Sequence, residues 1–110
     1  MAQPHLAPGE VGSVRPLGRQ LALTQSHALL KAPQLEVMRL VLLAGKTMPG
    51  HRVPGEITVQ CLEGVVDFHF DGQARRLRAG DFLHLAGSVP HQLTALEDAS
   101  LLVTICLLPA

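Results

Sequence analysis

The sequence contains no tryptophan, no tyrosine and only three phenylalanines. Proteins that bind single-stranded nucleic acid stack bases on aromatic rings, so we do not predict that activity for a chain this poor in rings. Charge is also scarce, because charged residues make up 16% of the chain and nine basic residues balance nine acidic ones. A neutral chain has no field that attracts nucleic acid or an anionic membrane surface, and we expect neither partner.

Cysteines are equally few, and long apolar stretches are missing. The two cysteines, Cys61 and Cys106, both lie in apolar segments, which favours buried free thiols in a reducing cytosol over a disulfide-stabilised scaffold. The first residues, MAQPHLAPGEVGS, have neither the charged start nor the apolar stretch of a secretory signal. The longest apolar run, Leu101 to Leu108, is too short to cross a bilayer. We therefore expect a cytoplasmic protein.

The chain is rich in glycine, proline and short apolar runs. At 110 residues, 47% of them hydrophobic, it can form one domain with a modest core. Ten glycines and eight prolines separate runs of strand length, which is typical of an all-β domain. We predict a flexible N-terminal arm over residues 1–16 and a single domain over 17–110. The strand-like runs are 35–43, 57–62, 65–70, 74–78, 82–85, 92–96 and 101–108, with a weaker one at 21–30.

Turn residues and alternation add detail to this plan. Asp71-Gly72 is a favoured two-residue hairpin turn, and Gly64 closes another tight turn at positive φ. Alternation along 65–70 and 57–61 separates an inner from an outer face. The predicted inner residues are Ile57, Val59, Cys61, Val66, Phe68 and Phe70.

Two runs do not alternate. Residues 40–43 and 101–105 are apolar on almost every position of both faces. A strand buried on both faces needs a second layer of structure, and 110 residues leave little sequence for it. We therefore predict that one sheet packs against a second copy of the chain in a homodimer.

Two stretches place a histidine beside turns rich in glycine and proline: GKTMPGHRVPGEITVQCLEG from Gly45 to Gly64, and GDFLHLAGSVPH from Gly80 to His91. Their spacing resembles the two motifs of the cupins, small double-sheet barrels of the jelly-roll type. Gly45, His51 and Gly64 match the first motif, and Gly80 and His91 match the second. The resemblance covers roughly residues 35–108 and implies an all-β, single-domain cupin barrel (a double-stranded β-helix).

The ligand positions of the motifs depart from the family pattern. Metal-binding cupins use three histidines and one glutamate. Here Val53 stands at the second histidine position, and Ile57 stands at the glutamate position, with Glu56 one residue earlier. Only His51 and His91 remain in register, so the resemblance implies a degenerate metal motif.

Two histidines leave most of a metal's coordination sphere unsupplied. If zinc, iron, nickel or manganese binds, His51 and His91 are its predicted ligands, and Glu56 on a bulged strand or Cys61 as a thiolate is the third. Otherwise both imidazoles line a metal-free pocket, where they bind a ligand or transfer a proton near neutral pH. The predicted pocket is largely apolar. Its predicted lining is His51, Ile57, Val59, Cys61, Phe68, Phe70, His91 and Leu93.

Three classes of function fit these residues: a non-catalytic sensor, a metal-free isomerase or epimerase, and a metal-dependent enzyme. The favoured interpretation covers the first two: a barrel that binds a small molecule of undetermined identity with an incomplete set of metal ligands, either as a sensor or as a metal-free isomerase or epimerase. The alternative is a metal-dependent enzyme of the dioxygenase or isomerase type that uses His51 and His91 with a non-standard third ligand. The sequence leaves open whether the protein is an enzyme.

Overall fold

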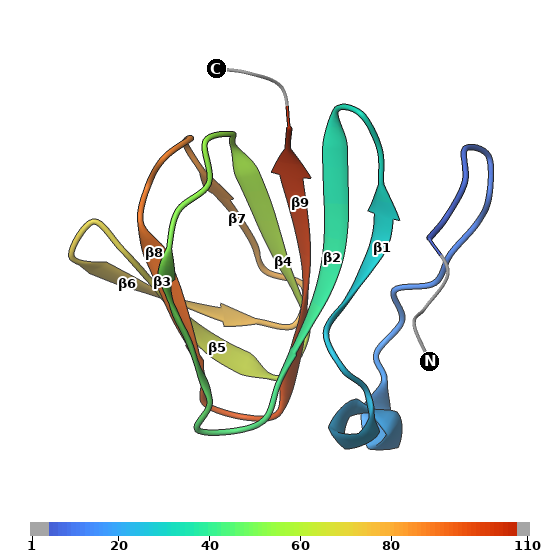
Figure 1. Cartoon of the computed structure of the whole chain (residues 1–110). Helices are drawn as coiled ribbons and strands as arrows, with labels where there is room; N and C mark the ends of the chain where they lie inside the picture. Colours follow the sequence, from blue (N-terminus) through green and yellow to red (C-terminus); the bar gives the residue numbers. More distant parts are fainter. Residues whose placement is uncertain (1–4, 108–110) are drawn as a thin grey trace.

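The structure, a computed structural model, describes residues 5–107 and consists almost entirely of strands (Figure 1). A short 3-10 helix, η1 (Gly18–Leu23), precedes the strands. The strands are β1 (His27–Lys31), β2 (Leu35–Leu42), β3 (Thr47–His51), β4 (Ile57–Glu63), β5 (Val65–Phe70), β6 (Gln73–Arg78), β7 (Phe82–Leu85), β8 (His91–Ala95) and β9 (Ala99–Cys106). Within residues 5–107 there is no helix of sufficient length and apolarity to span a membrane.

The strands form two antiparallel sheets that face each other. One sheet has five strands in the order β1-β2-β9-β4-β7, and the other has four in the order β3-β8-β5-β6. Neighbours such as β2 and β9 are far apart in the chain, as in a jelly roll. Figure 1 shows the two sheets enclosing the interior of a barrel. The predicted all-β, double-sheet barrel is therefore confirmed.

Most strands lie within two residues of the predicted runs, but β3 was missed. Its sequence contains Pro49-Gly50, which indicates a turn in a linear reading. Proline cannot donate a ladder hydrogen bond, and β3 tolerates it because β3 is an edge strand with a register shift between Met48 and His51. The predicted end of the last run, at Leu108, lies outside the described residues.

Both predicted tight turns are present. Asp71 and Gly72 have φ angles of 50° and 69°, as a two-residue hairpin with both central residues at positive φ requires. Gly64 has a φ of 81°, and a Cβ atom there would lie 2.2 Å from the Asp98 carbonyl oxygen. Glycine at position 64 is thus required both by the backbone conformation and by the close approach of another strand.

The inner faces of the two sheets form the core. The predicted inner residues of β4 are fully buried, as are Val66 and Phe68 of β5, whereas Phe70 is half-buried. The apolar runs of β2 and β9 alternate in the same way, because Leu40 and Leu101 are paired and both face the core. The inward faces that alternation predicted for β4 and β5 are thus confirmed, with Phe70 only half-buried.

A β-bulge reverses the direction of one side chain in β4. Cys61 pairs with Leu101 of β9 and points inward, but the register shifts before Glu63, which pairs with Ser100. Because the extra residue in a bulge re-aims the next side chain, Glu63 lies on the outer face of the five-stranded sheet. There it meets Ser100 and Arg39.

The N-terminal segment covers part of that outer face. Its backbone contacts β1 through the bond from the Leu6 N–H to the Leu29 carbonyl (2.8 Å), and Ser26 accepts from the Val41 N–H (2.8 Å). Leu21 of η1 is 4% exposed. The chain itself therefore supplies part of the second layer that we assigned to a partner subunit. The boundary between an arm and a domain, and the homodimer, stay predictions.

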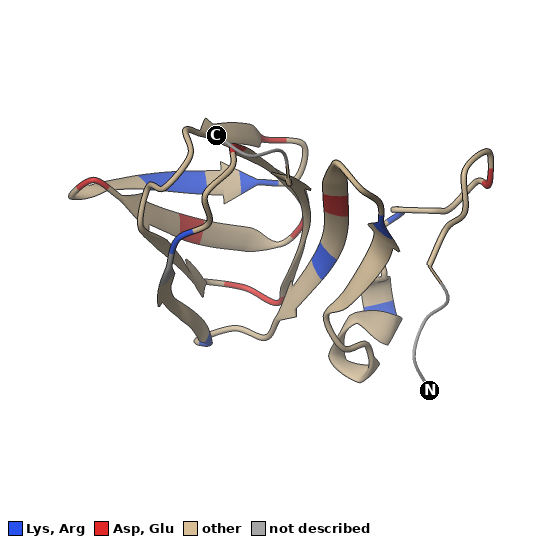
Figure 2. Cartoon of the chain, turned by 45° about the horizontal axis from the view of Figure 1, so that its top comes forward, with Lys and Arg blue, Asp and Glu red and all other residues tan. Residues whose placement is uncertain are grey.

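Charged residues are dispersed over the described surface (Figure 2). The broadest basic band lies on β6, where Arg76 contacts Asp67 through two hydrogen bonds of 2.9 and 3.2 Å. Arg75 lies over the Phe70 ring, 6.0 Å from its centroid. Because these arginines have neighbours on β5, the band is a solvated strand face rather than an isolated cationic patch.

Candidate ligand-binding site

A cavity of about 150 Å³ lies between the two sheets. Its walls come from β2, β4 and β9 on one side and from β3, β5 and β8 on the other. Its lining residues are Met38, Leu40, Met48, Ile57, Val59, Phe68, His91, Leu93, Val103 and Ile105. Among these described lining residues, the side-chain polar atoms other than the thioether sulfurs of Met38 and Met48 belong to His91.

His91 is the first residue of β8 and is 7% exposed. Its Nδ1 lies 3.0 Å from the Val89 carbonyl oxygen, and because a carbonyl can only accept, Nδ1 carries the proton in this bond. The neutral tautomer then has its lone pair on Nε2. The ring stacks on Phe68 with centroids 5.5 Å apart and an interplanar angle of 15°. The imidazole is held in one orientation at the cavity wall by its place on β8, by the Val89 carbonyl and by the Phe68 ring.

The backbone of His51 lies beside that of His91. The two residues are paired in the ladder between β3 and β8, so the two histidine-bearing stretches of the sequence meet at this point. The side chain of His51 lies outside the described part of the structure. Its assignment as a pocket residue and metal ligand stays a prediction.

The two candidates for a third metal ligand lie elsewhere. Glu56 is 67% exposed, and its Oε1 is 2.8 Å from Nε2 of His84. Cys61 is fully buried, and its thiol donates to the carbonyls of Glu63 and Gly64 at 3.5 and 3.6 Å. Burial raises the pKa of the Cys61 thiol, and its hydrogen bond to the Glu63 backbone offsets this only in part. A neutral, inward-packed thiol is a poor metal ligand.

The donors described at the cavity do not fit a first-row metal ion. Ile57 lines the cavity where the resemblance has a carboxylate, and Val53 packs against the core. Among the side chains that the structure describes, no three His, Cys, Asp or Glu residues gather where they could hold a metal. Such an ion needs about three protein ligands, and the described lining supplies one imidazole.

The predicted pocket matches the cavity in part. Five of its residues line the cavity: Ile57, Val59, Phe68, His91 and Leu93. Phe70 and Cys61 are absent from the lining because Phe70 turns toward β6, under Arg75, and Cys61 lies among the core residues near the β4–β5 turn. The residues that we missed are Met38, Leu40, Met48, Val103 and Ile105. Alternation could have found those on β2 and β9, but both faces of these strands are apolar in sequence, which left the choice open.

Sequence reasoning also missed a polar cluster outside the barrel. Nη2 of Arg39 donates to Glu63 Oε2 at 3.1 Å and to Ser100 Oγ at 3.0 Å, and Ser100 donates to Glu63 through a short hydrogen bond. The N–H groups of Leu17 and Gly18 donate to the same carboxylate, with shortest distances of 2.9 and 3.1 Å. The Arg39–Glu63–Ser100 cluster thus fastens the N-terminal segment to the sheet.

Comparisons with known proteins agree with this architecture. Residues 38–107 match the cupin domain family. A conserved protein of unknown function from Streptococcus pyogenes is similar over 100% of both chains, with a TM-score of 0.78 and 22% identity. A cupin superfamily protein from Desulfitobacterium hafniense is similar over 87% of this chain and 94% of its own, with a TM-score of 0.73 and 18% identity.

An RmlC-like cupin from Desulfovibrio desulfuricans has a TM-score of 0.69 and 23% identity over 96% of this chain and 97% of its own. At these identities the likeness is one of fold. No curated protein matches the sequence. Because the family match spans 38–107 and the double-sheet barrel is present, the chain belongs to the cupin domain family.

Proposed function

We propose that the barrel binds a small, mainly apolar molecule, without a metal, and that one polar group of the ligand lies beside His91. The observation that carries this proposal is a cavity of about 150 Å³ whose described lining is apolar apart from the imidazole of His91. Apolar concavities with few polar groups are typical of small-ligand sites. A cavity of about this volume admits benzene in another protein, so a single ring or a short branched chain of about six to eight non-hydrogen atoms fits.

His91 supplies the polar contact in this proposal. Nδ1 of His91 is bonded to the Val89 carbonyl, and the ring lies at the cavity wall. In general, a neutral imidazole can accept from a hydroxyl and a protonated one can donate to an acidic group. Stacking on Phe68 keeps the His91 ring in place without a metal. Phenol has one ring and one hydroxyl and is therefore a suitable probe.

The test is calorimetric titration of phenol into the full chain after treatment with EDTA. We expect saturable binding that Val103→Phe weakens at least tenfold, because Val103 lines the cavity. Leu102→Phe is the matched control, since Leu102 neighbours it on β9, pairs with Arg39 and faces outward. Absence of binding, or equal binding by both variants, contradicts the proposal.

The same protein preparation tests the metal-dependent alternative built on His51 and His91. Elemental analysis before EDTA treatment measures bound zinc, iron, nickel and manganese. We expect less than a tenth of an equivalent of each and no change in melting temperature when they are added. A stoichiometric metal that is required for phenol binding favours the metal-dependent enzyme instead.

We further propose that a second copy of the chain covers the part of the five-stranded sheet that the N-terminal segment leaves open. Phe82 of β7 is 64% exposed there, beside Gln60 of β4 and near Leu102 of β9. A two-fold axis over this face would pair each exposed ring with the same patch of its partner. Light scattering should give a mass near twice 11.8 kDa at micromolar concentration. Phe82→Lys should halve that mass, and a monomeric wild type contradicts the proposal.

A reducing, cytoplasmic location completes the proposal. Cys61 and Cys106 are both free thiols, the first buried and the second half-buried. Thiol titration of the denatured protein, purified without reductant, should give two thiols per chain. A disulfide-linked product contradicts this location.

A further inference from the structure

Each wall of the barrel cavity contributes one methionine. Met38 lies on β2 of the five-stranded sheet and Met48 on β3 of the four-stranded sheet, and both half-buried side chains line the cavity. Methionine is unbranched, rotates about three side-chain bonds and carries a polarisable thioether. The two thioethers can therefore contact a bound molecule from opposite sheets.

Strand pairing places each methionine at the end of a row of cavity residues. The row in the five-stranded sheet consists of Met38, Val103 and Val59, each paired with the next. The row in the four-stranded sheet consists of Met48, Leu93 and Phe68, paired in the same way. All members of both rows line the cavity. Because facing sheets pack about 10 Å apart, a molecule held between the two rows contacts both.

Phe68 ends the second row with an aromatic ring. This ring is 1% exposed, and the imidazole of His91 stacks on it. A benzene-type ring bound between the rows therefore meets a thioether from each sheet and an aromatic ring as well. Sulfur–aromatic and ring–ring contacts are favourable beyond the burial of apolar area. A saturated ring has no π system, so it gains only dispersion from the same groups.

We propose that the barrel site selects a planar aromatic ring over a saturated ring of the same size, and that Met38 and Met48 set this selectivity. The inference rests on the proposed function, in which a ring and a short branched chain fit the cavity equally. Each sulfur–aromatic contact strengthens binding roughly two- to tenfold. Two such contacts should therefore give a preference of at least about fivefold.

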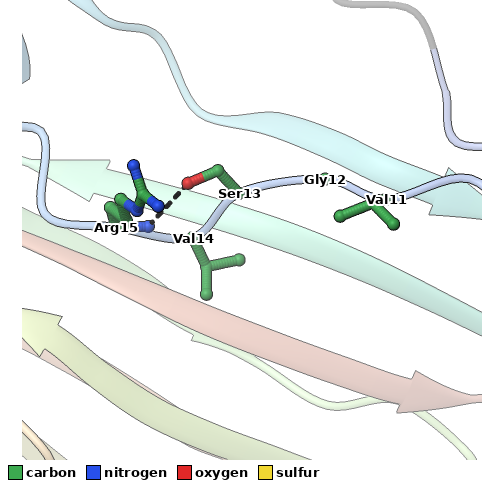
Figure 3. Close-up of a pocket in the computed structure, with 5 residues that line it drawn as sticks. All are labelled: Val11, Gly12, Ser13, Val14 and Arg15. Atoms are coloured by element: carbon green, nitrogen blue, oxygen red, sulfur yellow. Dashed lines mark hydrogen bonds between the residues drawn. The ribbon is translucent and has the colours of Figure 1, made fainter.

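Selection of this kind needs walls on both sides of the ligand. The hollow along residues 11–15 is lined, among the described residues, by that stretch alone. Figure 3 shows it as one extended segment, and its Val11 side chain is 95% exposed. A molecule in that hollow contacts one side only. Discrimination between rings is therefore expected of the barrel cavity and not of this hollow.

The test compares benzyl alcohol with cyclohexylmethanol by calorimetric titration into the EDTA-treated full chain. The two alcohols have the same number of non-hydrogen atoms and the same aliphatic hydroxyl, so they differ only in the ring. Both are within the size of about six to eight non-hydrogen atoms that fits the cavity. We expect saturable binding of both, with benzyl alcohol at least about fivefold tighter.

Two variants assign the preference to the thioethers. The double variant Met38→Leu/Met48→Leu nearly conserves volume, so it should fold, and it should reduce the preference to less than twofold while cyclohexylmethanol binds as before. Ile105→Leu is the control, because it alters the shape of another lining residue without adding or removing sulfur, and it should keep the preference.

Each remaining outcome overturns the inference. Equal affinity for the two alcohols in the wild type, or an unchanged preference in the double variant, does so and leaves the proposed function standing. Absence of saturable binding by either alcohol does so as well, and the separate titration of phenol then shows whether the proposed function fails with it.

Discussion

Replacement of Glu63 by glutamine tests how the N-terminal segment is held. Glu63 is 14% exposed and accepts from four groups: the N–H groups of Leu17 and Gly18, the Ser100 hydroxyl and the Arg39 guanidinium. Glu63→Gln keeps the shape of the side chain. It replaces one acceptor oxygen with an NH₂ donor and leaves Arg39 buried without a counter-charge.

The expected loss of stability is large. Removal of one partner from a buried ion pair costs about 3–5 kcal/mol, and we expect about 3 kcal/mol because the glutamine oxygen still accepts some of the bonds. Domains of this size unfold with about 5–15 kcal/mol, so the variant should fold. Urea unfolding at pH 7 measures the difference, with Glu97→Gln as the control because Glu97 is exposed.

Hydrogen exchange adds a local measurement. The amides of Leu17 and Gly18 should exchange much faster in Glu63→Gln, while core amides such as Val66 should exchange faster only to the extent that global stability falls. A loss below about 1 kcal/mol, comparable with that of Glu97→Gln, refutes the argument that this carboxylate fastens the segment.

Three further predictions concern pH, backbone and core. Hydrogen bonds from Leu17, Ser100 and Gly18, with the charge of Arg39, outweigh the effect of burial and lower the pKa of Glu63 below its ordinary value of 4.5. The stabilisation by the Glu63 carboxylate is therefore complete above about pH 4.5 and is lost as the pH falls through the lower folded pKa. The difference in free energy of unfolding between the wild type and Glu63→Gln, measured by urea unfolding, should be constant from about pH 5 to 8 and shrink below that range. Gly64→Ala should lower the free energy of unfolding by more than about 3 kcal/mol in the same assay, because its Cβ would meet the backbone of Asp98. Gly80→Ala, at a φ of 92° with open space around it, should lower it by about 1–2 kcal/mol. Leu93→Ala should lower the free energy of unfolding by about 3 kcal/mol because Leu93 is 1% exposed, and Leu96→Ala, at 42% exposure, by less than about 0.5 kcal/mol.

Local sequence rules predicted most of this fold. Asp71-Gly72, Gly64 and the alternation along β4 and β5 each depend on neighbouring residues alone, and each is present as predicted. Edge strand β3 was missed because Pro49 is acceptable only at a sheet edge, and edge position is a property of the whole sheet.

The candidate site was less predictable, because its features depend on tertiary structure. Val103 and Ile105 line the cavity, but β9 is apolar on both sides and its sequence does not distinguish them. Glu63 faces outward only because a bulge shifts the register after Cys61, and no residue pattern marks that shift. The covering of β2 by the N-terminal segment depends on the same carboxylate.

The central claim is that the barrel cavity binds a small molecule without a metal, and its two methionines report on this directly. Met38 and Met48 both line the cavity. In EDTA-treated protein with ¹³C-labelled methionine methyl groups, we predict NMR cross-relaxation between the ring protons of phenol and both methyl groups, and loss of these signals in Val103→Phe. Phenol that leaves both methyl signals unchanged at saturating concentration would contradict the claim.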